Sequence, residues 1–495
     1  MTLSQPARVL LWSMLILLAL RCAAQAVVPL MPQEAYYWMY AQHPSLSYYD
    51  HPPMVAWVIG LGTTIFGNTE WGVRVVGGVM MLGAGVLMYA FARLWWRSSV
   101  ALAATLLFEL GPVYFGIGFL ATMDAALLAF WLVALLGFSI AVRRGQVWGW
   151  YLCGFGFGGA MLSKYTGVFI APGIALLLLW HRPWRRLLLT PHPYCGFLIG
   201  VMMFWPVVVW NWQHDWASFR FQFLSRFDDP VAARKRPFLE FVLQQIATAT
   251  PIVLLAMGMV IWRGGRRVRF GVREKVALAF AVPLLLSMLP KAWTYPAHIN
   301  WTAPAYLSFL PAAIQAARVR VRAVQNRPGW AWRRGVVLPT LVGSSAINIG
   351  LVLFLLVLQP KLHAFRVFGP WAEIAAVVEH YEDDLEHQTG REPLVIVDGK
   401  YELASLVAFY RNRTDPHDLP AIYTVNQVAL NDKALGFAYW TDMARWRGTD
   451  CVFVDDDMDT EQRLRGKFKS VKVVWTGRAA NGREYRITQC RDYLG

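Results

Sequence analysis

Apolar stretches of about 20 residues recur along the first 360 residues, and short polar loops separate them. A helix of that length and composition is long enough to cross a lipid bilayer. The pattern predicts eleven membrane spans, near residues 8–28, 72–92, 100–119, 124–142, 148–163, 166–181, 194–211, 243–262, 276–290, 302–317 and 336–358. We therefore expect a mainly α, polytopic membrane domain over residues 1–360.

Three of these spans allow a second interpretation. The fifth and sixth are short and Gly-rich, and Ser163-Lys164-Tyr165-Thr166 lies between them. They form either one long broken helix or two half-depth helices. The first span could be a cleaved signal peptide, because Ala24-Gln25-Ala26 mimics a small-residue cleavage site. We favour a retained span, since the apolar stretch is long.

The last 135 residues follow a different pattern. Leu394 to Asp398 and Cys451 to Asp455 are short apolar runs typical of buried strands, and residues 401–410 between them have helical periodicity. Residues 469–476 and 483–488 predict a hairpin around Asn481-Gly482. We expect a small α/β domain over residues 361–495, in which an oxidising compartment would permit a disulfide between Cys451 and Cys490.

Composition agrees with a membrane protein. Of the 495 residues, 56% are hydrophobic and 16% charged, which excludes a disordered chain and disfavours a soluble enzyme. The net charge of +16 would suit a nucleic-acid partner, but its distribution argues otherwise. Residues 361–495 hold 18 basic and 21 acidic residues, which leaves 29 basic and 10 acidic residues for the hydrophobic part.

The basic residues predict the topology. Twenty of those 29, with Glu274 as their one acid, lie at Arg8 or in alternate inter-span loops. The positive-inside rule places these loops in the cytoplasm. Eleven spans that start inside leave the C-terminal domain outside, and we expect a bacterial inner-membrane protein whose working face is periplasmic.

The few acids gather on the outer face. Carboxylates near hydrocarbon are costly and mark function. The first external loop holds Glu34, Asp50 and Glu70, and Asp124 lies at the mouth of the fourth span. Glu109, inside the third span, has a simpler explanation as the partner of an Arg or Lys in the bundle.

Each candidate also has a structural explanation. The aromatic residues of the first external loop suit an interfacial belt, in part a helix lying flat. Asp124 suits a helix start, with Thr122 as the cap. Asp50-His51 before two prolines is less easily explained, because an Asp beside a His can bind a metal or move protons. Lys164 in apolar surroundings needs an anion, either a carboxylate or a phosphate.

Several motifs in order resemble bacterial glycosyltransferase family 39, the relatives of dolichyl-phosphate-mannose protein mannosyltransferases and of the lipid A aminoarabinose transferase. They cover roughly residues 25–310, whereas the C-terminal domain matches weakly. The motifs are Gln33-Glu-Ala-Tyr-Tyr-Trp38, Tyr48-Tyr-Asp-His-Pro-Pro-Met-Val-Ala-Trp57, Thr122-Met-Asp124, Leu162-Ser-Lys-Tyr165, Trp210-Asn-Trp-Gln-His-Asp-Trp216, Ser218-Phe-Arg-Phe-Gln222 and Asn300-Trp-Thr-Ala-Pro-Ala-Tyr306.

The resemblance implies a GT-C enzyme that moves a sugar from a polyprenyl-phosphate carrier to an extracytoplasmic acceptor, with inversion by a single displacement. The acceptor would be lipid A, another envelope glycan or a protein. No nucleotide cofactor is expected, which fits the absence of a nucleotide-binding loop motif. The family places an Asp-Glu pair in the first external loop, and this chain has Gln33-Glu34 there. Because glutamine cannot act as a base, the catalytic work falls to Glu34, Asp50 or Asp124.

The expected site therefore has three parts. The catalytic candidates are Glu34, Asp124 and Asp50. The residues expected to bind substrate are Gln33, Tyr36, Tyr37, His51, Lys164, Arg220, Lys291 and His298. A divalent metal, if one is used, would take Asp50, His51 and His214 as ligands.

Two other classes of function remain open from the sequence. A transporter or lipid flippase would need several mid-membrane charges and, commonly, internal repeats. Only Glu109 is clearly such an acid, and no repeat is visible. Loss of the family's Asp could also leave a catalytically silent scaffold whose external domain binds a partner.

Overall fold

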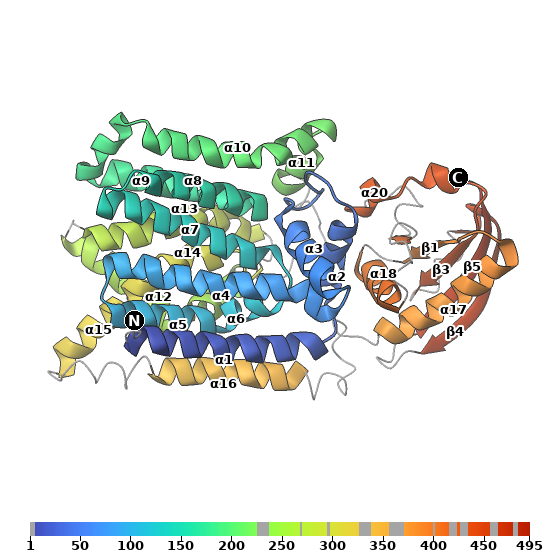
Figure 1. Cartoon of the computed structure of the whole chain (residues 1–495), viewed down its shortest axis with the longest axis horizontal. Helices are drawn as coiled ribbons and strands as arrows, with labels where there is room; N and C mark the ends of the chain where they lie inside the picture. The colour runs from blue at the N-terminus through green and yellow to red at the C-terminus, as the bar shows by residue number, and fades with distance from the viewer. Residues whose placement is uncertain are drawn as a thin grey trace. The chain divides into compact units, whose positions relative to one another are not determined.

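A computed structural model describes residues 5–224, 237–267, 270–294, 298–325, 338–355, 371–398, 401–414, 423–425, 434–455, 464–478 and 484–495. Most of the first 355 residues are helical, and a small sheet lies in the C-terminal part (Figure 1).

Every predicted span coincides with one or two helices, because long apolar runs satisfy their backbone hydrogen bonds internally. In chain order these are α1 (Gln5–Val27), α4 (Glu70–Trp95), α5 (Ser98–Leu110) with α6 (Pro112–Phe119), α7 (Met123–Arg144), α8 (Trp148–Ser163), η1 (Tyr165–Phe169) with α9 (Ile170–Trp180), α10 (His192–Gln213), α12 (Pro237–Arg267), α13 (Val272–Thr294), α14 (Ala303–Leu307) with α15 (Leu310–Gln325), and α16 (Leu338–Leu353).

Some of the helices are each long enough to cross a membrane alone, and others could do so in pairs. Among the described residues, α4, α7 and α10 are each long and apolar enough to cross a membrane alone. Three bent helix pairs would raise that number to six, and one of them is α5 with α6, bent by 60° at Gly111-Pro112. The chain thus contains membrane-spanning helices, and the predicted number of eleven stays a prediction.

The break between the fifth and sixth predicted spans falls at Lys164. This residue has an extended backbone (φ −158°, ψ 141°) that ends α8, and the 3₁₀ turn η1 follows. The interruption exposes no side-chain charge to the outside of the bundle, because Lys164 is buried. The sequence thus places a buried cation at a helix break.

Small residues let neighbouring helices approach closely. A Cβ added at Gly154 of α8 would lie 1.9 Å from the carbonyl oxygen of Gly196 in α10, so only glycine fits there. Such contacts are typical of helix pairs in membranes. The other side of α10 is apolar and exposed, with Met202 and Trp205 more than half exposed, as expected of a surface that faces lipid.

The first external loop contains α2 (Pro32–Gln42) and α3 (Met54–Phe66). The helix predicted in this loop is therefore present. The aromatic residues of α2 are buried rather than arrayed on a surface, since Tyr36, Tyr37, Trp38 and Tyr40 are each at most 1% exposed, whereas Trp57 of α3 is 47% exposed. Their main role in this structure is packing.

The C-terminal domain is α/β, as predicted. Its sheet has the order β2-β1-β3-β5-β4, in which β2, β1 and β3 are parallel and β5 is antiparallel to both β3 and β4. The strands are β1 (Leu394–Val397), β2 (Tyr423–Val425), β3 (Cys451–Asp455), β4 (Phe468–Arg478) and β5 (Glu484–Tyr493), and α17 (Trp371–Thr389) and α18 (Glu402–Thr414) are the main helices. The Asn481-Gly482 turn lies outside the described residues.

Cys451 and Cys490 are partners in the antiparallel register of β3 and β5. Both are buried free thiols in this structure, and burial raises the pKa of Cys451 well above its usual value. Their oxidation to a disulfide stays a prediction.

The chain packs as two units. The bundle unit comprises Met1–Cys22, His51–Val55 and Gly77–Leu351, and the loop-tail unit comprises Ala23–Asp50, Ala56–Val76 and Val352–Gly495. The sequence suggested a boundary at residue 360 that leaves the first external loop with the membrane part. By packing, most of that loop instead belongs with the C-terminal domain.

Candidate active site

A buried ion pair marks the start of α7 in the bundle unit. The Lys164 Nζ atom lies 2.8 Å from Oδ1 of Asp124, and both side chains are almost completely buried. Thr122 is the N-cap of α7, as predicted, and its hydroxyl accepts a hydrogen bond from the Asp124 backbone N–H. Asp124 thus occupies a helix start and also supplies the anion that Lys164 needs.

Asn300 completes this cluster. Its side-chain amide donates to Oδ2 of Asp124, so each carboxylate oxygen has its own partner. The segment that carries Asn300 is fixed on both sides. The Ile299 carbonyl accepts a hydrogen bond from Thr248 of α12, and Gln245 of α12 accepts hydrogen bonds of 2.8 Å from the hydroxyls of Thr302 and Tyr306. The bundle therefore holds the Asp124 cluster in one geometry.

A tight turn joins α10 to α11 (Ala217–Phe223). Asp215 and Trp216 both have left-handed backbones, at φ 50° and 59°, which is unusual for residues other than glycine. Buried Asn211 stabilises the turn, because its backbone carbonyl accepts from Trp216 N–H and its side-chain oxygen accepts from Phe219 N–H. The turn presents Arg220 on an exposed face of α11.

In the loop-tail unit, Glu34 is bound by Arg74. The Arg74 Nε atom lies 2.7 Å from Oε1 and one terminal nitrogen lies 2.6 Å from Oε2, and both side chains are at most 1% exposed. The second oxygen also accepts from Met31 N–H in the capping box of α2. Arg74 donates further to the carbonyls of residues 25, 28 and 29. Both Glu34 oxygens therefore accept hydrogen bonds, as both Asp124 oxygens do, but Glu34 is held by a bidentate guanidinium and a helix cap whereas Asp124 is held by an ammonium and an amide.

Two tyrosines hold Asp50. The hydroxyls of Tyr36 and Tyr40 both donate to Oδ1 of Asp50, Tyr36 from 3.1 Å. The Tyr36 oxygen in turn accepts from the Gly436 backbone N–H at 2.9 Å. Burial, and then the Asp50 charge, raise the pKa of both tyrosines well above the usual value, so both remain donors at physiological pH. Tyr36 therefore links the Asp50 carboxylate to the segment before α20 (Phe437–Trp440) of the C-terminal domain.

The other expected substrate residues have separate surroundings. Exposed Gln33 donates to the Tyr37 hydroxyl at 2.7 Å. His51 is buried in the bundle unit, and His298 is exposed with its ring 5.3 Å from that of Trp301. Lys291 lies on α13, but its side chain is outside the described residues.

The expected metal ligands do not form a recognisable site. Across the part of the chain that the structure describes, no three His, Cys, Asp or Glu side chains group in a way that could hold a metal ion. The Nδ1 atom of His214 lies 2.7 Å from the Trp210 carbonyl oxygen, and the two rings stack at 4.2 Å. A divalent metal held by Asp50, His51 and His214 stays a prediction.

Sequence reasoning missed two residues of these clusters. Asn300 lies within a motif that was recognised but assigned no role. Arg74 could have been found from the sequence, because a basic residue inside the predicted span 72–92 needs an acidic partner. Its partner, Glu34, is 40 positions away.

Comparison with solved structures identifies the fold. The solved structure of ArnT from Cupriavidus metallidurans in the apo state is 18% identical in sequence, and the alignment covers 97% of each chain with a TM-score of 0.63. The same protein bound to undecaprenyl phosphate aligns over 98% of each chain with a TM-score of 0.62. The chain therefore has the GT-C fold of integral-membrane glycosyltransferases.

Sequence comparison shows which proteins part of the chain resembles. Residues 50–210 match the family model of dolichyl-phosphate-mannose-protein mannosyltransferases. The predicted resemblance is thus confirmed, and the chain is similar to glycosyltransferase family 39 proteins of the aminoarabinose-transferase type.

Two curated relatives show how far the similarity extends. The lipid A galacturonosyltransferase RgtD of Rhizobium johnstonii is 30% identical over 281 residues, which is 56% of this chain and 58% of the relative. The undecaprenyl phosphate-alpha-4-amino-4-deoxy-L-arabinose arabinosyl transferase of Erwinia tasmaniensis is 26% identical over 241 residues, 46% of this chain and 43% of the relative. The chain spans about half the length of the curated relatives that it matches.

Proposed function

We propose that this protein is an inner-membrane glycosyltransferase that moves a sugar from a polyprenyl-phosphate carrier to lipid A on the periplasmic side. The observation that carries the proposal is the buried Asp124 and Lys164 pair, held by Asn300, in a chain with the GT-C fold. The two similar proteins, a lipid A galacturonosyltransferase and an undecaprenyl-phosphate-sugar transferase, support the donor and acceptor classes.

The residue types suit the chemistry. In the proposed reaction the acceptor hydroxyl oxygen bonds to the anomeric carbon of the donor sugar. The bond from that carbon to the phosphate oxygen breaks, and the polyprenyl phosphate leaves with the electron pair. The ammonium of Lys164 would balance charge on the departing phosphate. The carboxylate of Asp124 would accept the hydroxyl proton. Such a single displacement inverts the anomeric centre.

The distribution of charge supports a periplasmic site. Asp124 begins α7, whereas Arg143 and Arg144 end it. The positive-inside rule then assigns the arginine end to the cytoplasm and the Asp124 end to the periplasm. An acceptor such as lipid A, exposed on that side, would meet the Asp124 end of the bundle.

The test compares envelope lipids by mass spectrometry in three strains that lack the protein, carry the wild type, or carry Asp124→Asn. Lipid A from the strain without the protein should lack a defined sugar mass. The wild-type protein should restore that mass, and the Asp124→Asn variant should not. Unchanged lipid A in all strains would exclude lipid A as acceptor. Movement of a labelled lipid across proteoliposomes without covalent sugar transfer would favour a flippase instead.

A further inference from the structure

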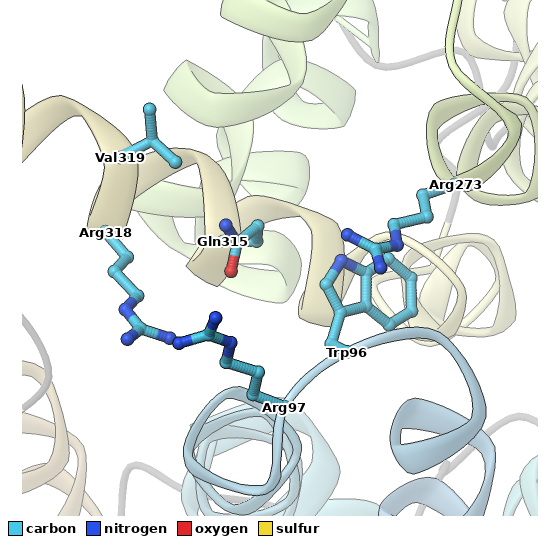
Figure 2. A pocket seen from close by; sticks show the side chains of 6 residues that line it. All are labelled: Trp96, Arg97, Arg273, Gln315, Arg318 and Val319. Carbon is cyan, nitrogen blue, oxygen red and sulfur yellow. The ribbon is translucent and has the colours of Figure 1, made fainter.

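A polar cavity lies in the bundle unit, and the Asp124 cluster does not line it. It has a volume of about 320 Å³, and Figure 2 shows its lining side chains. They are Trp96, Arg97, Arg273, Gln315, Arg318 and Val319. We call this cavity the arginine pocket.

The arginine pocket concentrates positive charge. It has three guanidinium groups, and none of its described lining residues is acidic. In Figure 2 the guanidinium groups of Arg97 and Arg318 point toward one another, and Arg273 lies beside Trp96. Within the described part of the chain, no ion pair is recorded for Arg97 or Arg273, and both are exposed, whereas Arg318 is only 9% exposed. Three guanidinium groups facing one space favour an anion with several acceptor oxygens.

A larger cavity of about 440 Å³ adjoins the arginine pocket, and Trp96 and Arg273 line both. Its walls are mostly apolar and include Met259 and Val260 of α12. It also has one acid, Glu274, whose carboxylate accepts the Gly271 backbone N–H at the start of α13. A polar pocket next to an apolar one suits an amphiphile better than a free ion.

The two cavities lie at the opposite end of α7 from Asp124. Arg143, near the last residue of α7, lines the larger cavity, and Asp124 is in the first turn. At about 1.5 Å per residue, the two ends are roughly 30 Å apart, which is about the thickness of a bilayer core. The loops at this end are the basic ones, so this end faces the cytoplasmic leaflet.

We propose that the arginine pocket binds the phosphate diester of an anionic glycerophospholipid from the cytoplasmic leaflet, with the adjoining cavity taking the first part of the lipid tail. Guanidinium groups would donate paired hydrogen bonds to the non-bridging phosphate oxygens, and Trp96 would lie at the interface between headgroup and tail. This site is separate from the proposed chemistry at Asp124 and does not depend on it.

The test is native mass spectrometry of the full-length protein in detergent, titrated with phosphatidylglycerol or with zwitterionic phosphatidylcholine. The wild type should retain phosphatidylglycerol preferentially. The double variant Arg97→Ala/Arg273→Ala should bind it about tenfold more weakly, because at least one charge-assisted hydrogen bond is lost. The variant Arg97→Lys/Arg273→Lys should fall between the two, since it keeps the charge but not the paired geometry.

A matched control has the same change in charge. Arg144 and Arg186 are exposed and line neither cavity, so Arg144→Ala/Arg186→Ala should bind phosphatidylglycerol like the wild type. An equal loss in both double variants would overturn the proposal, because binding would then reflect net charge alone. Displacement of the lipid by equimolar inorganic phosphate would also overturn it, in favour of a free-anion site. Thermal unfolding of each double variant checks that replacing these exposed arginines leaves the fold intact.

Discussion

The ammonium of Lys164 lies 2.8 Å from the carboxylate of Asp124, although 40 positions separate the two residues in the chain. Lys164 lies in the extended break after α8, and Asp124 lies in the first turn of α7. A salt bridge buried in this way stabilises the bundle only weakly relative to an apolar pair, because both charges lose their water. Under the proposed function, the pair serves the transfer reaction rather than stability.

We expect Asp124→Asn to lower sugar transfer by about 100-fold or more, the usual cost of losing a general base. Lys164→Met should lower transfer as well, because the charge of the leaving phosphate is then unbalanced. The exchanged variant Asp124→Lys/Lys164→Asp serves as control, since it restores an ion pair but reverses the roles. Sugar transfer is measured in proteoliposomes with a polyprenyl-phosphate sugar donor. If the exchanged variant recovers activity, the ion pair has only a structural role.

Glu34 is expected to be mainly structural. Glu34→Gln leaves the buried Arg74 guanidinium without its counter-charge and should destabilise the protein by about 3–5 kcal/mol. The double variant Glu34→Met/Arg74→Met should be less destabilised than either single variant. Denaturant or thermal unfolding measures this. If Glu34→Gln keeps wild-type stability but loses transfer, Glu34 is catalytic after all.

The Tyr36 hydroxyl is expected to connect Asp50 with the C-terminal domain. Tyr36→Phe removes one donor to Asp50 and leaves the Gly436 N–H without this acceptor, at a cost of about 1–3 kcal/mol. Hydrogen exchange of the Gly436 amide should become faster. Tyr48→Phe is the control, because the Tyr48 hydroxyl bonds to the Tyr40 carbonyl and the Ser45 backbone rather than to Gly436, so this variant should leave the Gly436 amide protected.

The same tyrosines predict how stability depends on pH. Burial raises the pKa of Tyr36 and Tyr40 well above the usual value, and that of Tyr48 to about 12. At pH below about 10, tyrosine is protonated in both the folded and the unfolded states. Above that pH the unfolded chain loses protons that the folded chain retains, so stability should fall as pH rises. The free energy of unfolding is measured from pH 7 to 11. The contribution of these tyrosines should stay constant up to about pH 10 and should lower stability above it. Tyr36→Phe should make the loss of stability above pH 10 smaller.

Glu109 provides a test against the transporter hypothesis. It forms a buried ion pair with Arg21 of α1 at 3.1 Å, as the sequence suggested for an acid inside a span. We expect Glu109→Gln to destabilise the bundle, and Glu109→Leu/Arg21→Leu to restore part of the stability. Transfer activity per folded molecule should remain close to that of the wild type. A folded Glu109→Gln variant that has lost only lipid transport would support a flippase.

The sequence alone determined the elements of this protein. Each long apolar run became one or two helices because a chain in hydrocarbon must satisfy its own hydrogen bonds. The short apolar runs 394–398 and 451–455 form the neighbouring parallel strands β1 and β3. The predicted strand 469–476 lies in β4, which pairs with β5 in the antiparallel sense. The scarcity of acids pointed to Asp124, and the isolation of Lys164 indicated that it needed an anion. These properties are local or follow from composition.

Only the tertiary structure decided which charges meet. Asn300 reaches Asp124 across 176 positions, and Arg74 reaches Glu34 across 40. Tertiary packing also joined most of the first external loop to the C-terminal domain. The arginine pocket likewise gathers side chains from the connection between α4 and α5, the start of α13 and the interior of α15. Hydrophobic patterning fixes where a helix lies in the chain but not which partner its polar side chains meet, because that depends on how the helices pack.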